Sequence, residues 1–259
     1  MHLSRRQVLK RSGGVLLGGV LASALRPALA QAAAPEREVS PELHLLRRTG
    51  WGVRAGDVAR LRELGREAYL AAQLEPESVP DPLADAFMAK NRVLSADLQT
   101  LREAADEDYG RLLEQTLWAR IYRAAYSERG LYERMVEFWT DHLNVPIPDL
   151  LVDKIIDDRE VVRKHALGRF ADLLRASAMS PATLQYLDNA SSSKAYPNEN
   201  YARELLELHT LGVDGGYAEQ DVKEVARAFT GWTLHEGVPG RFYFDADKHD
   251  GGEKRVLGR

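Results

Sequence analysis

The feature that most constrains this chain is the spacing of its apolar residues, which return every three or four positions through most of the sequence. That period matches the 3.6-residue turn of an amphipathic α-helix, whereas a half-buried strand would alternate. Helix boundaries follow from local chemistry: Ser40-Pro41 is typical of a helix start, and Gly50 and Gly52 are typical of its end. We therefore predict a mainly α protein with a multi-helix, orthogonal bundle-like domain.

The same spacing predicts further helices, with one or two long ones in 95–128. They fall roughly at 55–74, 95–128, 130–144, 150–156, 159–177, 181–188, 198–211 and 219–230. Within 95–128, one apolar stripe is formed by Leu113, Leu117, Ile121 and Ala124. The pattern changes near the end, where residues 241–245 alternate and a glycine turn at 250–252 precedes 254–257. This predicts a small β-hairpin near the C-terminus.

The first 30 residues have the organisation of a twin-arginine export signal. The run Ser4-Arg5-Arg6-Gln7-Val8-Leu9-Lys10 matches the twin-arginine pattern except at Val8. A Gly-rich apolar run at 13–25 and a small-residue cleavage site at 28–30 follow. A membrane anchor is the alternative, but a run of about 13 residues is shorter than the roughly 20 that a spanning helix needs.

We therefore expect the translocase of this pathway to bind Arg5 and Arg6. Residues 1–30 are the expected signal peptide and residues 31–40 a linker. No membrane span is expected to be retained, and the product is expected to be periplasmic or secreted.

Removing that signal makes the chain markedly acidic. Residues 1–30 carry five of the 35 basic residues and no acidic one, so 30 Lys and Arg remain against 39 Asp and Glu, a net charge of -9. Nucleic-acid binding is not expected, because no basic stripe longer than Arg47-Arg48 occurs. The absence of cysteine excludes disulfides, thiolate metal sites and cysteine nucleophiles.

Several motifs together resemble one bacterial family. Those in the second half lie at 186–189, 197–212, 220–222, 226–232 and 249–250. They closely resemble the DUF1800 family, exported proteins of uncharacterised function. Two earlier motifs, His44–Gly52 and Phe138–Val145, are similar to the family's opening and to its central aromatic, His and Asn motif.

The resemblance covers nearly all of residues 41–258 and implies that 41–259 is one DUF1800-like helical domain. Family members usually continue well beyond the His-Asp-Gly region, so we expect this chain to be truncated at its C-terminus. They are frequently encoded beside a second exported, sulfatase-like protein. The resemblance therefore implies a partner without naming a reaction.

Two histidines are candidates for chemistry because they lie on inward faces of predicted helices. His209 shares a face with Ala202 and Leu206, and His142 follows Phe138 by one turn. Histidines on separate helices can meet as metal ligands or as acid and base. They can equally be core histidines with hydrogen-bonded partners. No cofactor is identified by the sequence.

Nearby acids do not decide between these alternatives. Glu137 and Glu204 each precede a histidine by five positions, about 140° around an α-helix, whereas chelation from one face needs three or four. A metal would therefore need ligands from different helices. Neither the two-histidine zinc-protease helix nor the Glu-x-x-His pair is present.

Polar residues at the helix start near 198 supply further candidates. Capping by Asn198 and the helix dipole account for part of this cluster but leave Asn200 and Arg203 unexplained. Together with Asp188-Asn189 they are candidates for binding a sugar hydroxyl or an anion. The Ser191–Lys194 run has a Ser-x-x-Lys spacing but lacks the accompanying motifs of that chemistry, so we expect a solvated loop.

The pair His249-Asp250 lies in the predicted turn. It is either a proton-transfer pair or ordinary turn chemistry. Two functions remain open from sequence: an exported enzyme or cofactor protein with a His, Glu and Asn site acting in the cell envelope, or a non-catalytic helical scaffold that binds another exported protein.

Overall fold

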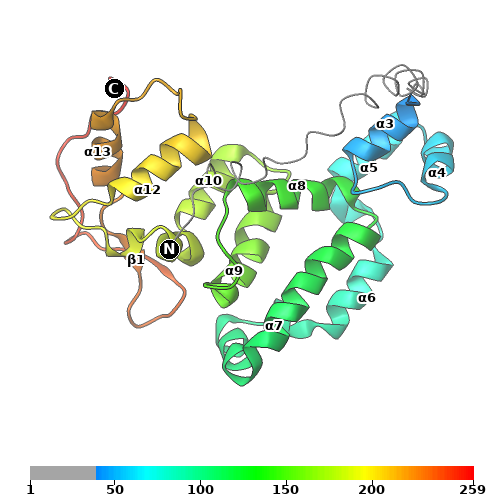
Figure 1. Ribbon diagram of the computed structural model, residues 1–259, viewed down its shortest axis with the longest axis horizontal. Coiled ribbons are helices and arrows are strands. Elements are labelled where there is room, and N and C mark those ends of the chain that lie inside the picture. Colours follow the sequence, from blue (N-terminus) through cyan, green and yellow to red (C-terminus); the bar gives the residue numbers. More distant parts are fainter. Residues whose placement is uncertain (1–38) are drawn as a thin grey trace, which may run out of the picture. The chain divides into compact units, whose positions relative to one another are not determined.

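The computed structural model describes residues 39–259. The chain divides into two units, Met1–Pro41 and Glu42–Arg259, and the second holds the helical domain (Figure 1). The predicted signal at 1–30 and most of the predicted linker lie outside the described residues. Among the helices of 39–259, none has the length and apolar character needed to span a membrane.

Helices make up most of the described chain, which confirms the mainly α prediction. The α-helices are α3 (Pro41–Arg48), α4 (Asp57–Leu64), α5 (Arg66–Leu74), α6 (Pro82–Lys90), α7 (Leu98–Tyr126), α8 (Gly130–His142), α9 (Leu151–Asp157), α10 (Phe170–Ala178), α11 (Pro181–Tyr186), α12 (Glu199–Glu204) and α13 (Glu219–Ala228). Three short 3₁₀ turns are η1 (Pro76–Ser78), η2 (Arg92–Ser95) and η4 (Asn189–Ser191). Two π-helices are η3 (Asp158–Arg163) and η5 (Leu205–Thr210).

Separate apolar clusters hold these helices together. One lies where η2 and α9 pack on α7, and its buried members are Leu94, Leu101, Leu112, Ala119, Leu151 and Ile155. Another joins α12 and η5 to α13, which lie side by side in Figure 1, through Ala202, Leu206, Val222, Val225 and Ala226. Burial of each leucine or valine side chain contributes about 1.5–3 kcal/mol.

The long helix α7 is bent at Asp108, whose backbone leaves the helical region. The Asp108 carboxylate accepts a hydrogen bond from the Arg111 N–H at 2.9 Å and so caps the second half, which makes α7 two helices in one element. Of the predicted apolar stripe, Leu113 packs against the core cluster, but the next two members do not. Leu117 and Ile121 are 43% and 54% exposed, because Leu112 and Ala119 face α9 instead.

The two π-helices change which residues share a face. A π-helix bonds residues five apart, and such segments are rare and frequent at functional sites. In η3, Arg163 therefore reaches Asp158, five positions earlier, with its Nε 2.9 Å from Oδ2. Each π-helix directly continues an α-helix, η3 after α9 and η5 after α12.

The small hairpin near the C-terminus is confirmed. It pairs β1 (Trp232–Leu234) with β2 (Phe242–Phe244), Trp232 lying opposite Phe244. The predicted pairing with 254–257 was wrong, since that segment forms no strand. Residues 235–241 provide a closer connection, with Gly240 at a φ of 68°. The later segment runs beside α13, where the Leu257 N–H donates to Asp221 Oδ1 at 2.6 Å.

Candidate functional site

The two candidate histidines lie together and bind each other's backbone. His209 Nδ1 lies 2.8 Å from the His142 carbonyl oxygen, and His142 Nε2 lies 3.1 Å from the His209 carbonyl oxygen. The ring centroids are 5.9 Å apart, at 75°. Because a carbonyl only accepts, both ring nitrogens must carry the donated proton. We call this arrangement the histidine pair.

This geometry fixes the tautomer of each neutral ring and leaves one nitrogen available on each. The available nitrogens are Nδ1 of His142 and Nε2 of His209. Burial lowers the pKa of His209, and the hydrogen bond to the His142 carbonyl and the Glu204 carboxylate only partly offset this change. His209 is therefore a neutral imidazole at neutral pH.

Aromatic side chains surround the histidine pair. His142 stacks with Phe138 at 6.1 Å and meets the ring edges of Trp139 and Phe170 at 5.7 and 6.2 Å. Phe138 is 54% exposed and Phe170 is 39% exposed. Phe138, Trp139, His142 and Phe170 form a surface that we call the aromatic surface.

The polar candidates on α12 point elsewhere. Asn200 is exposed. The Arg203 guanidinium pairs with Glu219 at 2.6 Å on the surface. Glu204 is followed directly by the π-helix η5, in which residues five apart lie on one face. Glu204 and His209 therefore lie closer to a common face than they would in an α-helix. The α12 start itself is capped by Asn198, whose Oδ1 accepts from the Tyr201 N–H at 3.0 Å.

The polar loop before α12 has two buried residues, Asn189, which was a candidate for binding a ligand, and Ser192, which was expected in a solvated loop. Asn189 is 0% exposed, and its amide donates to the carbonyls of Phe229 and Trp232 at 3.2 and 3.4 Å. Ser192 is 1% exposed, and its hydroxyl accepts from the Asn198 N–H at 3.1 Å. The expectation of a solvated serine loop was therefore wrong for Ser192, which ties the loop to the start of α12.

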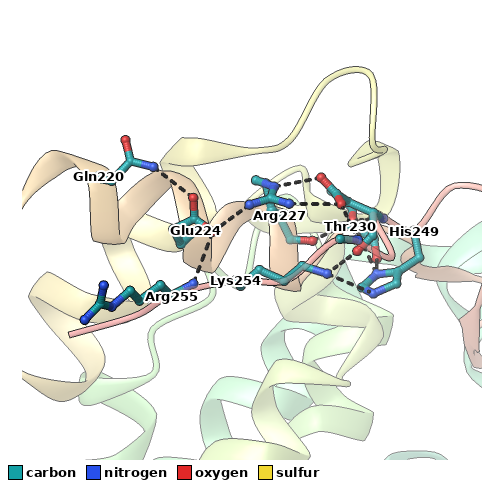
Figure 2. A network of polar contacts seen from close by, with 9 residues as sticks. Gln220, Glu224, Arg227, Thr230, His249, Lys254 and Arg255 are labelled. Carbon is teal, nitrogen blue, oxygen red and sulfur yellow. Dashed lines mark hydrogen bonds and ion pairs between the residues drawn. The ribbon is translucent and has the colours of Figure 1, made fainter. Parts of the chain in front are cut away.

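His249 and Asp250 belong to a network that fastens the C-terminal segment to α13 (Figure 2). The Asp250 carboxylate accepts from Arg227 Nε at 2.7 Å and from Nη2 at 3.2 Å, and these bonds hold the pKa of Asp250 well below its usual range. His249 Nδ1 donates to the Thr230 carbonyl at 2.8 Å, and Lys254 Nζ donates to the Asp250 carbonyl.

The Thr230 hydroxyl completes this network without being available for chemistry. Thr230 is fully buried, donates to the Arg227 carbonyl at 2.7 Å and accepts from the Asp250 N–H at 2.8 Å. An Asp250 held ionised by Arg227 does not exchange protons near neutral pH. The geometry therefore favours a structural role for His249 and Asp250, in which they stabilise the turn, over a role in proton transfer.

A buried charged cluster, which sequence reasoning missed, is built on η3. Arg163 donates to both Glu133 oxygens at 3.0 and 2.9 Å and to Asp158 at 2.9 Å. The Arg163 and Glu133 side chains are only 12% and 9% exposed. Burial opposes the charge on Arg163, but Asp158 and Glu133 raise its pKa. The only indication in the sequence was the five-residue spacing of Asp158 and Arg163. Residues at that spacing share a face in a π-helix but not in an α-helix.

The structure thus brings His142 and His209 together, places Glu204 near His209, and separates this group from His249 and Asp250. Residues 39–259 contain no group of three or more His, Asp or Glu arranged to hold a metal ion. His142 and His209 consequently stay predictions as metal ligands, and any such site would need a further donor.

Comparison with known proteins gives a family and no closer relative. Neither the curated proteins nor the solved structures contain a significant match. The family model described as "Protein of unknown function (DUF1800)" matches residues 44–259. That match spans the histidine pair, the η3 cluster and the network around Arg227. The chain belongs to the DUF1800 family, as its motifs predicted.

Proposed function

We propose that this protein is an exported, helical binding protein of the cell envelope that docks another exported protein on its aromatic surface. The observation that carries the proposal is the exposure of Phe138 and Phe170 beside a histidine pair whose rings are held in place by backbone bonds. The proposal therefore prefers the scaffold alternative to the enzyme.

The aromatic surface has the features of a protein-binding hot spot. Aromatic residues are enriched at the centres of interfaces, where rigid side chains lose little entropy on binding. Phe138, Trp139 and Phe170 are such side chains, with Trp139 stacked on Phe170 at 5.5 Å. Trp139 is further fixed by its Nε1–H, which donates to the Ala166 carbonyl at 3.0 Å.

Charge defines the chemistry of the partner. Asp141 is exposed beside His142, and Glu207 lies two positions before His209. The chain beyond residue 30 carries 39 acidic against 30 basic residues. The partner should therefore present an apolar or aromatic anchor flanked by Lys or Arg. The co-encoded sulfatase-like exported protein implied by the family resemblance is our proposed partner.

Replacing Phe138 with alanine should weaken this binding by about 2 kcal/mol, roughly thirtyfold in Kd, because a central anchor is lost. Calorimetric titration of the purified sulfatase-like protein into the mature chain measures the effect. Trp118→Ala is the matched control, since Trp118 is 53% exposed on α7. Equal affinity of Phe138→Ala and the parent, or no binding by the parent, would contradict the proposal.

A second candidate function rests on the neutral His209. Its Nε2 is unbonded within the described residues while Nδ1 donates to a carbonyl, which is the arrangement of a general base or a metal ligand. His209→Asn separates the two functions, because the amide preserves a donor to the His142 carbonyl and removes Nε2. Partner binding should survive this change, whereas loss of in vivo function with binding intact would favour an enzyme.

We further propose export through the twin-arginine translocase. Replacing both Arg5 and Arg6 with lysine should keep the protein in the cytoplasm, because the translocase recognises the arginine pair. Immunoblots of periplasmic and cytoplasmic fractions measure the distribution. A strain lacking the translocase should retain the unaltered chain in the same way, and continued export of the double-lysine variant would refute this route.

A further inference from the structure

The charged cluster on η3 borders a cavity that is independent of the proposed docking surface. The cavity lies between α7, η2 and the α9–η3 helix and has a volume of about 70 Å³. One wall is apolar, with Leu94, Ile147 and Ile155. The charged lining residues are the cations Arg120, Arg123, Lys154, Arg159 and Arg163 and the acid Asp158.

Four of these cations already have carboxylate partners. Lys154 pairs with Asp157 at 2.8 Å, Arg163 with Glu133 and Asp158 at 2.9 Å, Arg120 with Glu137 at 2.8 Å, and Arg159 with Glu160 at 2.7 Å. The partners Glu133, Glu137, Asp157 and Glu160 do not line the cavity. The charged groups that line the cavity itself are therefore mostly guanidinium and ammonium groups.

Arg123 differs from the other four. Within residues 39–259, its guanidinium makes no hydrogen bond and no ion pair at 4.0 Å or less. Burial lowers the pKa of Arg123 and the charge of Arg163 lowers it further, while the Glu133 and Asp158 carboxylates only partly offset this. A guanidinium has five N–H donors, and leaving them unbonded in a partly buried site is costly.

We propose that this cavity binds the carboxylate of a small organic acid, with Arg123 as the residue that receives it. A planar guanidinium matches a carboxylate with two parallel hydrogen bonds. Leu94, Ile147 and Ile155 then contact the short hydrocarbon part of the ligand. A cavity of about 150 Å³ holds benzene, so the volume of about 70 Å³ here limits the enclosed part of the ligand to roughly a carboxylate and one or two further carbon atoms.

A second basic cavity lacks this property. It has a volume of about 230 Å³ and is lined by the Thr49–Arg54 segment, Arg60 and Glu128. There Arg54 and Arg60 both pair with Glu128, at 3.0 and 2.6 Å, so its arginines are already neutralised. Because only Arg123, among the described arginines that line these two cavities, lacks a carboxylate partner, we place the ligand's carboxylate in the Arg123 cavity and not in the larger one.

The test is calorimetric or NMR titration of the mature chain with acetate, propionate and inorganic phosphate in a chloride buffer. Propionate should bind saturably and more tightly than acetate, because its methyl group reaches the apolar wall. Arg123→Gln should abolish binding and Arg123→Lys should weaken it. Arg111→Gln, on an exposed part of the same helix, should bind like the parent.

Stability in the absence of carboxylate provides a second measurement. If Arg123 awaits a ligand, Arg123→Met should leave the midpoint of urea unfolding nearly unchanged, since removing a buried unbonded cation offsets the loss of its attraction to Asp158. Propionate should raise the midpoint of the parent and not of Arg123→Met. Binding of phosphate alone, no saturable binding, or a clear loss of stability in carboxylate-free Arg123→Met would overturn the proposal.

Discussion

Replacing Arg163 with methionine is expected to lower the free energy of unfolding by about 3–5 kcal/mol, because the change leaves the buried Glu133 and the partly buried Asp158 carboxylates without their cation. Glu133 loses both of its hydrogen bonds from Arg163, and Asp158 loses the bond from Nε. Methionine retains most of the side-chain volume, so the loss reports charge rather than a cavity. Urea unfolding followed by circular dichroism measures it.

The same cluster sets the acid sensitivity of the fold. Burial alone would raise the pKa of Asp158, but Arg163 and Arg123 bring it below its ordinary value. A lowered folded-state pKa stabilises the protein above the unfolded value of about 3.9, and this stability is lost as pH falls through the folded pKa. The difference between parent and Arg163→Met should therefore shrink in strong acid.

Arg159→Met is the control for this prediction. Arg159 lies in the same π-helix, but its side chain and that of Glu160 are 32% and 54% exposed. Such a pair contributes at most about 1 kcal/mol, and with the hydrogen bonds from Arg159 Nη1 to the Leu94 and Ala96 carbonyls the expected loss is about 1–2 kcal/mol. Adding Glu133→Gln to Arg163→Met should restore part of the lost stability. Equal effects of Arg163→Met and Arg159→Met would show that the cluster is not a buried ion network.

The second large effect is expected at Gly231, which joins α13 to β1. Its φ is 77°, and a Cβ there would overlap the Asp245 carbonyl oxygen and press on His249. Gly231→Ala should therefore cost about 3 kcal/mol or more, combining left-handed strain with displacement of the hairpin and its hydrogen bonds. The bonds at risk are Gly231 N–H to Ser192 at 3.1 Å and Asp245 N–H to Gly231 at 2.8 Å.

Gly212→Ala separates the two contributions. Gly212 has a φ of 83°, but a Cβ there meets nothing within 4 Å. Gly212→Ala should therefore lower the free energy of unfolding by only about 1 kcal/mol, the cost of the left-handed backbone conformation. Thermal unfolding of both variants measures the difference. If the two alanines are equally destabilising, contact with the Asp245 and His249 backbone does not explain the glycine at 231.

Helical periodicity predicted the fold class because each helix buries its own apolar face, and this information is local. It could not say which face of α7 is buried, since Leu112 and Leu117 both fit an apolar stripe and only the bend at Asp108 and the position of α9 decide between them. The hairpin partner was missed for a related reason. Alternation marks a strand such as 242–244 but says nothing about whether its neighbour precedes or follows it.

The candidate site was predictable in part. The inward faces of His142 and His209 followed from their spacing, but their mutual backbone bonds depend on two helix ends meeting. Glu204 was a candidate, but its five-residue spacing from His209 predicted different α-helical faces, and η5 is a π-helix. Arg123 carried no signal at all. An arginine on a charged helix is normally solvated, and its missing partner is visible only in three dimensions.

The histidine pair has a consequence for how the domain comes apart. His142 and His209 both lie in the last turn of their helical segments, where carbonyl oxygens have no partner within the helix. Each imidazole satisfies one of those carbonyls on the other segment, so each segment ends by capping the other. Neither end can fray alone without costing the other its cap. We expect residues 130–142 and 199–210 to open as one cooperative unit, although 56 residues separate them in the sequence.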